Sequence, residues 1–171
     1  MLRQRIATAI VLLVGLIAMT TSLGLEAFAA VTGALVLIGA WEWAAFASLG
    51  SKSRLAFVGT LALSIALLWF ALGLAGNNGY DASFALGFSL LGALFWALMF
   101  GAIVSFPGST EAWNDKSRIS VMGMLSLLGT WVGLVTLKAL LPSGALVIML
   151  IIMVAAVDVG AFFTGKLFGK R

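Results

Sequence analysis

The stretch from Ala145 to Arg171 reads ALVIMLIIMVAAVDVGAFFTGKLFGKR, and its residue pattern decides the fold class of the chain. It begins as a charge-free apolar run, continues through a single carboxylate, Asp158, and ends in a cationic segment that includes Lys166 and Lys170. A charged side chain in a membrane helix costs about 2.5–3.5 kcal/mol on insertion scales, so it is rarely kept without a partner, a water-filled cavity or a task. The stretch therefore predicts a membrane helix whose carboxylate has a function.

The composition extends this prediction to the whole chain. Hydrophobic residues make up 63% of the sequence and charged residues 9%, and the mean hydropathy is +1.18. Soluble domains carry about 25% charged residues, so we expect an integral membrane protein. Since a helical crossing needs about 20 residues, 171 residues have room for about six spans. We predict an all-α polytopic protein in which residues 1–171 form a single transmembrane domain.

Six apolar runs mark the predicted spans. They lie at about residues 6–23, 27–47, 55–75, 84–104 and 119–137, with the sixth beginning at residue 145. The first run follows the basic sequence MLRQR, as in a secretory signal. We expect it to remain as the first membrane helix, because it is longer than a signal core and further spans follow it.

The cations predict the orientation of the spans. With a cytoplasmic N-terminus, the cytoplasmic ends hold nine of the ten basic residues and the opposite ends hold only Lys138; the nine are Arg3, Arg5, Lys52, Arg54, Lys116, Arg118, Lys166, Lys170 and Arg171. This asymmetry in short loops predicts that both termini are cytoplasmic and that Asp158 lies nearer the cytoplasmic face. Cations scattered in ones and twos make no stripe for a phosphate backbone, so we expect no nucleic-acid partner.

The absence of histidine and cysteine from the sequence narrows the kinds of catalytic and metal-binding site that the chain can form. It excludes disulfides, thiolate chemistry, histidine general bases and the usual zinc sites. Any metal would be a hard cation held by oxygen ligands.

Three other features have structural interpretations. The Trp41-Glu42-Trp43 motif fits either an interfacial aromatic belt or a polar contact inside the bundle. The glycines at positions 129 and 133 predict a helix-packing face. The hydrophilic segment 105–118 is expected to be a solvated connector, although a role facing a substrate stays open.

Helical spacing places a glycine-bearing groove beside Asp158. At 100° per residue, Asp158, Phe162, Gly165 and Gly169 share one line along the helix, and Gly160 with Thr164 forms a second pair of small residues on a nearby face. Such a surface admits another helix or a lipid headgroup close to the backbone, and the terminal cations attract phosphate. This arrangement suits a site that handles phospholipids. The alternative is that Asp158 pairs within the bundle and the cations only fix the topology.

The run VDVGAFFTGKLFGK at residues 157–170 resembles a segment of the phosphatidate cytidylyltransferase family, approximately D-[TS]-G-A-Y-x-x-G-[RK]-x-F-G-[KR]. The opening residues LRQRI resemble the N-terminus of that family, and Trp41-Glu42-Trp43 falls where its second span carries a similar element. Two positions depart from the pattern: Val159 replaces a hydroxyl residue and Phe162 replaces a tyrosine.

The resemblance implies transfer of a cytidylyl group from CTP to phosphatidic acid, giving CDP-diacylglycerol and pyrophosphate with Mg²⁺. It implies that Asp158 is a catalytic and metal-binding candidate, and that the substrate-binding candidates are Gly160, Gly165, Lys166, Lys170 and Arg171. We expect the site to face the cytoplasm from the inner membrane of a bacterium.

Family members are longer, with a segment rich in Lys and Asp that carries the metal-binding acids. The resemblance therefore implies that these residues form the N-terminal portion of such an enzyme, inactive alone. Its partners would be membrane lipids and either a further C-terminal portion or a second copy of the chain.

Two alternatives from other classes remain at this point. A small transporter or channel would use Asp158 for proton or cation coupling. A non-catalytic membrane scaffold would need Asp158 only for stability.

Overall fold

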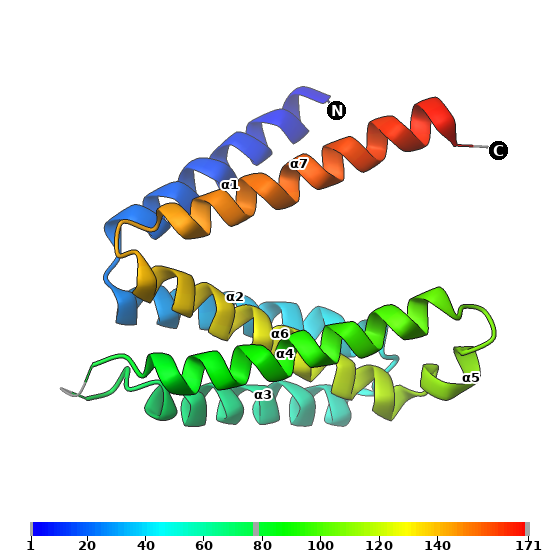
Figure 1. The fold of residues 1–171 in the computed structure, drawn as a ribbon, viewed down its shortest axis with the longest axis horizontal. Coiled ribbons are helices and arrows are strands. Elements are labelled where there is room, and N and C mark those ends of the chain that lie inside the picture. Colours follow the sequence, from blue (N-terminus) through cyan, green and yellow to red (C-terminus); the bar gives the residue numbers. More distant parts are fainter. Residues whose placement is uncertain (1, 77–78, 170–171) are drawn as a thin grey trace. The chain divides into compact units, whose positions relative to one another are not determined.

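The computed structural model describes the backbone of residues 2–76 and 79–169, and the side chains of these residues except 2–10, 12 and 112. Within this part the chain is helical and no strand occurs, which confirms the predicted all-α fold (Figure 1). The helices are α1 (Leu2–Ser22), α2 (Leu25–Phe46), α3 (Ser51–Ala71), α4 (Ala82–Val104), α5 (Thr110–Trp113), α6 (Lys116–Leu140) and α7 (Ala145–Phe168).

The long helices correspond to the six predicted spans. Among the described residues, five helices are long and apolar enough to cross a membrane: α2, α3, α4, α6 and α7. The sixth, α1, is 21 residues long. Length and composition thus identify the protein as an integral membrane protein.

Helices α3 and α6 begin earlier than the predicted spans, because they include the charged residues that precede the apolar runs. Helix α3 begins at Ser51 and α6 at Lys116, so Lys52, Arg54 and Arg118 lie in first helical turns rather than in loops. A helix does not end where its apolar run ends, because its backbone bonds continue as favourably among polar side chains.

The predicted end of the third span at residue 75 was also wrong, since α3 ends at Ala71. Gly73 has a φ of 74°. Its N–H donates to the Phe70 oxygen, and the Leu74 N–H donates to the Trp69 oxygen. This is a Schellman arrangement, which glycine terminates without steric penalty. Asp81 then begins α4 by accepting a 2.9 Å hydrogen bond from the Phe84 N–H.

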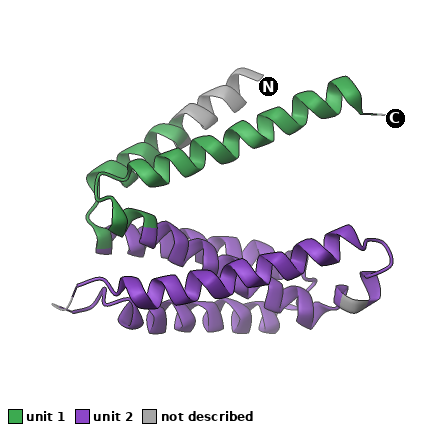
Figure 2. Cartoon of the chain, in the orientation of Figure 1, with its two compact units in different colours: residues 1–25, 137–171 green, residues 26–136 purple. Residues whose placement is uncertain are grey.

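Contacts between Cα atoms separate the chain into two compact units (Figure 2). Unit 1 contains residues 1–25 and 137–171, and unit 2 contains residues 26–136. Each unit is described below by itself.

The core of unit 2 is built around Trp131 of α6, which is fully buried. Its indole nitrogen donates a 2.9 Å hydrogen bond to the main-chain oxygen of Ala29 in α2. Gly33, one turn further along α2, makes room for the ring, because a Cβ there would lie 3.3 Å from the same nitrogen. Trp69 of α3 stacks on the Trp131 ring with centroids 6.5 Å apart. One tryptophan thus connects three helices.

A second indole joins α2 to α6 through Trp43, which donates a 2.9 Å hydrogen bond to the Ile119 oxygen. Its ring lies so close to Gly123 that a Cβ on that residue would overlap the ring. At Gly129 and Gly133, by contrast, no described atom lies within 4 Å of an added Cβ, so the predicted packing face at these glycines has no close neighbour among the described residues and stays a prediction. The indoles of Trp131 and Trp43 thus use the space that Gly33 and Gly123 leave in this unit.

Unit 1 is organised around Lys138, the one basic residue that the sequence places on the side opposite the other nine. Lys138 is 3% exposed, and its ammonium group donates 2.6 Å hydrogen bonds to the main-chain oxygens of Thr20 and Pro142. Gly144, with a φ of 78°, packs directly on Thr20. A cation near the end of α6 is favourable because it meets the negative end of the helix dipole. Lys138 therefore holds the end of α1 against the turn between α6 and α7.

Candidate functional site

The predicted site residues that the structure describes all lie on helix α7, which belongs to unit 1. Asp158, Gly160, Gly165 and Lys166 are all exposed. No described atom lies within 4 Å of a Cβ built on Gly160 or on Gly165. The glycines thus keep the backbone of α7 accessible around Asp158, as a site for a headgroup or a neighbouring helix requires.

The predicted line of residues below Asp158 is shorter than expected. Phe162 and Gly165 lie within α7, but the helix ends at Phe168. Gly169 has an extended backbone, with φ −65° and ψ 120°, and its N–H donates to the Gly165 oxygen. Placing Gly169 on the helical face was therefore wrong, because this residue terminates the helix.

The structure also changes the interpretation of the second pair of small residues, Gly160 and Thr164. The Thr164 hydroxyl donates to the main-chain oxygens of Gly160 and Ala161, at 3.0 and 3.1 Å. A hydroxyl bound to its own helix has no proton left to donate to a ligand. The Gly160 surface thus offers close approach rather than a hydroxyl donor.

The predicted cations are only partly within the described residues. Lys166 lies in the last turn of α7, where the helix dipole favours a cation. Lys170 and Arg171 lie outside the described residues. Their roles stay predictions.

The donor set around Asp158 bears on the expected metal. In the described part of the chain, no group of three or more acidic, histidine or cysteine side chains is placed to hold a metal ion. Mg²⁺ is commonly bound by one or two carboxylates together with substrate phosphates. An exposed carboxylate without soft donors fits one position of such a site.

The three residues of the Trp41-Glu42-Trp43 motif have different surroundings. Glu42 is exposed. The polar contact inside the bundle is made by Trp43, through its bond to Ile119. The Arg54 guanidinium lies 5.6 Å from the centroid of the Trp41 ring, which is a cation–π distance. The motif therefore contributes to packing in unit 2, and its acid lies on the surface.

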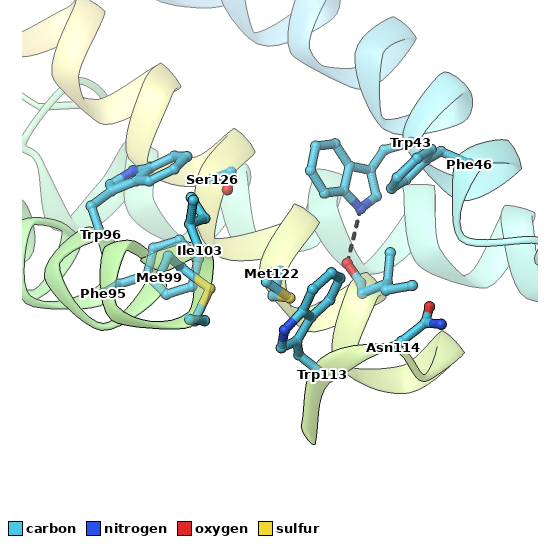
Figure 3. Close-up of a pocket in the computed structure, with 12 residues that line it drawn as sticks. Trp43, Phe46, Phe95, Trp96, Met99, Ile103, Trp113, Asn114, Met122 and Ser126 are labelled. Carbon is cyan, nitrogen blue, oxygen red and sulfur yellow. Dashed lines mark hydrogen bonds between the residues drawn. The ribbon is translucent and has the colours of Figure 1, made fainter. Parts of the chain in front are cut away.

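Unit 2 also contains a cavity of about 290 Å³ that the sequence did not indicate (Figure 3). Its lining comes from four segments of this unit and consists of Trp43, Phe46, Phe95, Trp96, Met99, Ala102, Ile103, Trp113, Asn114, Ile119, Met122 and Ser126. The segment 105–118, expected to be a solvated connector, includes the short helix α5, and Trp113 at its end is half-buried. A tryptophan within an otherwise polar loop was the signal for this packing.

The chain resembles known cytidylyltransferases over its whole length. A model described as the cytidylyltransferase family matches residues 3–171. A phosphatidate cytidylyltransferase of Pseudomonas aeruginosa is 38% identical over 174 residues, which cover 100% of this chain and 60% of the relative. One of Haemophilus influenzae, with the same name, is 31% identical over 183 residues, covering 100% of this chain and 62% of the relative.

These relatives are longer than the sequence studied. The chain spans about 60% of the length of the curated relatives it matches. No solved structure matches it.

Proposed function

Because this chain belongs to the cytidylyltransferase family, we propose that it contributes to transfer of a cytidylyl group from CTP to phosphatidic acid. The observation that carries the proposal is the match over residues 3–171, together with the names of two relatives similar along the whole chain. In this reaction a phosphate oxygen of phosphatidic acid bonds to the α-phosphorus of CTP. The bond from that phosphorus to the β-phosphate oxygen breaks, and pyrophosphate leaves with the electron pair.

Asp158 is the residue of this chain that we assign to the reacting phosphates. Its carboxylate is exposed on α7, and the open backbone at Gly160 and Gly165 lies between it and the basic end of the helix. With CTP phosphates it would hold Mg²⁺, which supplies charge neutralisation for the leaving pyrophosphate. Because Val159 and Phe162 replace a hydroxyl residue and a tyrosine, and the Thr164 hydroxyl bonds to its own helix, we assign the polar contacts with the substrates to Asp158 and the cations.

The binding of the lipid phosphate falls to the end of α7. Lys166 and the terminal Lys170 and Arg171 are cations at the depth of lipid headgroups if the helix spans the bilayer. Gly160 and Gly165 would let the headgroup approach the backbone, since no described side chain fills the space beside them. This assignment requires the site to face the cytoplasm, where CTP is made available, as the cation asymmetry predicts. In the bacterial relatives' setting we place the protein in the inner membrane.

The experiment is a chimera in which these 171 residues replace the matched region of the Pseudomonas aeruginosa relative. The purified chimera is given CTP, Mg²⁺ and phosphatidic acid in mixed micelles, and CDP-diacylglycerol and pyrophosphate are measured. We expect both products in equal amounts. We expect the 171-residue chain alone to release no pyrophosphate above background, since it spans only about 60% of the length of these relatives.

The controls separate failure of chemistry from failure of folding. The unchanged relative must be active under the same conditions, and the chimera must elute as a single species in detergent with native helix content. A folded chimera without either product would overturn the proposal. Omission of phosphatidic acid should abolish pyrophosphate release, which distinguishes transfer from CTP hydrolysis.

A further inference from the structure

We infer that the cavity of unit 2 binds the acyl chain of a membrane phospholipid. The cavity has a volume of about 290 Å³, near the lower end of the range of about 300–1,000 Å³ typical of ligand pockets. It lies wholly within unit 2, so the inference depends on no other part of the chain. It is also independent of the proposed function, because it involves neither CTP nor the residues of α7.

The lining is mostly apolar, and two of its three indole N–H groups donate to other atoms of unit 2. The indole nitrogen of Trp43 donates to the Ile119 oxygen at 2.9 Å, as the dashed line in Figure 3 shows. The indole nitrogen of Trp113 donates to the Ser109 hydroxyl at 3.2 Å. Both rings therefore present carbon surface to the cavity. Asn114 and Ser126 are the polar residues among the twelve that line it, and none of the twelve is charged.

The shape of the lining suits an extended chain. Along α4 the lining runs from Phe95 to Ile103, which is about 12 Å at 1.5 Å per residue. From Trp113 and Asn114 in the polar connector, the lining continues along the apolar part of α4, from Ile103 back to Phe95. A lipid tail follows the same course from the interface toward the middle of the bilayer.

The surroundings determine the occupant. Phe46 is 72% exposed, Trp96 57% and Ile103 66%, so no other part of unit 2 covers the rim of the cavity. Around a helix of this apolarity the medium is hydrocarbon. An apolar cavity does not retain water, so the tail of a neighbouring lipid is the group that fills it. Met99 and Met122 add flexible side chains that adapt to the course of the tail.

Photolabelling tests the inference. The protein is reconstituted in phosphatidylcholine vesicles that contain a phosphatidylcholine with a diazirine on its acyl chain, and labelled peptides are identified by mass spectrometry after irradiation. We expect labels to be concentrated on the lining segments of α4 and α6. Labelling spread evenly over exposed faces of the helices would overturn the inference, since it indicates surrounding lipid only.

A matched pair of variants on α4 sharpens the test. Ala102→Trp fills the cavity, whereas Ala97→Trp adds the same ring on an exposed position that does not line it. We expect Ala102→Trp to reduce labelling of Met122 to the level of exposed residues outside the cavity, because the indole occupies the space that the tail would fill. Ala97→Trp should leave it unchanged. Equal labelling in the two variants would contradict the inference.

Two further measurements keep the test decisive. Ser126→Leu fills less of the cavity and serves if Ala102→Trp does not fold; a smaller reduction in the same direction is expected. Phosphatidic acid and phosphatidylcholine that carry the same diazirine tail should label Met122 equally within about twofold, since no charged side chain lines the cavity. A preference for phosphatidic acid of about tenfold or more would show headgroup recognition and overturn a site for the acyl chain alone.

Discussion

The indole nitrogen of Trp131 donates to the main-chain oxygen of Ala29, 2.9 Å away and 102 positions earlier in the sequence. Both residues are fully buried. Helix backbones in a bilayer are already satisfied internally, so a side-chain bond between helices fixes how they pack rather than whether they form. This bond sets the position of α6 on α2 within unit 2.

Replacement of this donor should destabilise the protein. Trp131→Phe removes the N–H and leaves a small void, and we expect a loss of about 1–3 kcal/mol in the free energy of unfolding. For a chain of this size that lowers the melting temperature in detergent by about 2–4 °C per kcal/mol. Trp96→Phe, at a ring that is 57% exposed, serves as the control and should change it by less than half as much. Equal effects would contradict the role of the bond.

Two glycines of α6 should respond to alanine with opposite signs. Gly123→Ala places a Cβ where the Trp43 ring lies, and we expect a destabilisation of about 1–3 kcal/mol from overpacking. Gly129→Ala meets no described atom within 4 Å, and we expect a stabilisation of about 0.5–1 kcal/mol from the lower entropy of the unfolded chain. Thermal unfolding of the two variants decides the point. A destabilising Gly129→Ala would indicate that a partner covers this face.

The buried ammonium of Lys138 should contribute strongly to unit 1. Lys138→Met keeps the length of the side chain but removes the donor to Thr20 and Pro142. Hydrogen bonds from charged groups contribute about 1.5–3 kcal/mol, so we expect at least this loss in unfolding free energy. Lys52→Met, at an exposed cation, should change stability by no more than about 0.5 kcal/mol. A Lys138→Met protein as stable as the Lys52→Met protein would contradict the structural role.

Tyr80 provides a pH-dependent measurement, since it is the single tyrosine of the sequence. Burial raises the pKa of its phenol above the ordinary 10.0; the hydrogen bond with Thr136 opposes this, and the charge of Asp81 adds to it. A raised pKa in the folded protein contributes stability below pH 10 that is lost as the pH rises through the raised value. Phenolate absorbance should show a midpoint above 10.0, and Asp81→Asn should bring it closer to that value. A midpoint at or below 10.0 in the folded protein would be inconsistent with burial of this side chain.

The sequence predicted the fold class well for a physical reason. Apolar runs of about 20 residues can satisfy their backbone groups in a bilayer only as helices, so the long helices follow from hydropathy. Helix ends were less predictable, because they depend on local backbone geometry. Gly73 ended α3 at its positive φ, and no change in hydropathy marked the place.

The contacts between helices could not be predicted from spacing. Gly129 and Gly133 have the expected interval but no close neighbour among the described residues, whereas Gly123 receives an indole. In the sequence, Lys138 indicated only the orientation of the spans. Its burial depends on the Thr20 carbonyl, which is 118 positions away in sequence. The cavity of unit 2 likewise required residues from four separate segments.

The candidate site on α7 was predicted from one anomalous residue and a family resemblance. The structure supports exposure of Asp158 and open space beside Gly160 and Gly165, and it removes Gly169 from the helical face. Contacts with a nucleotide or a lipid phosphate depend on groups that a single helix cannot supply.

The central claim is tested most directly by cytidylyl transfer in the chimera that carries Asp158→Asn. We expect the rate of CDP-diacylglycerol formation to fall by about 100-fold, which corresponds to about 2.7 kcal/mol of transition-state stabilisation, with an unchanged melting temperature. Glu26→Gln, at an exposed carboxylate in the first turn of α2, is the control and should keep the full rate. Undiminished transfer by the folded Asp158→Asn chimera would contradict the account.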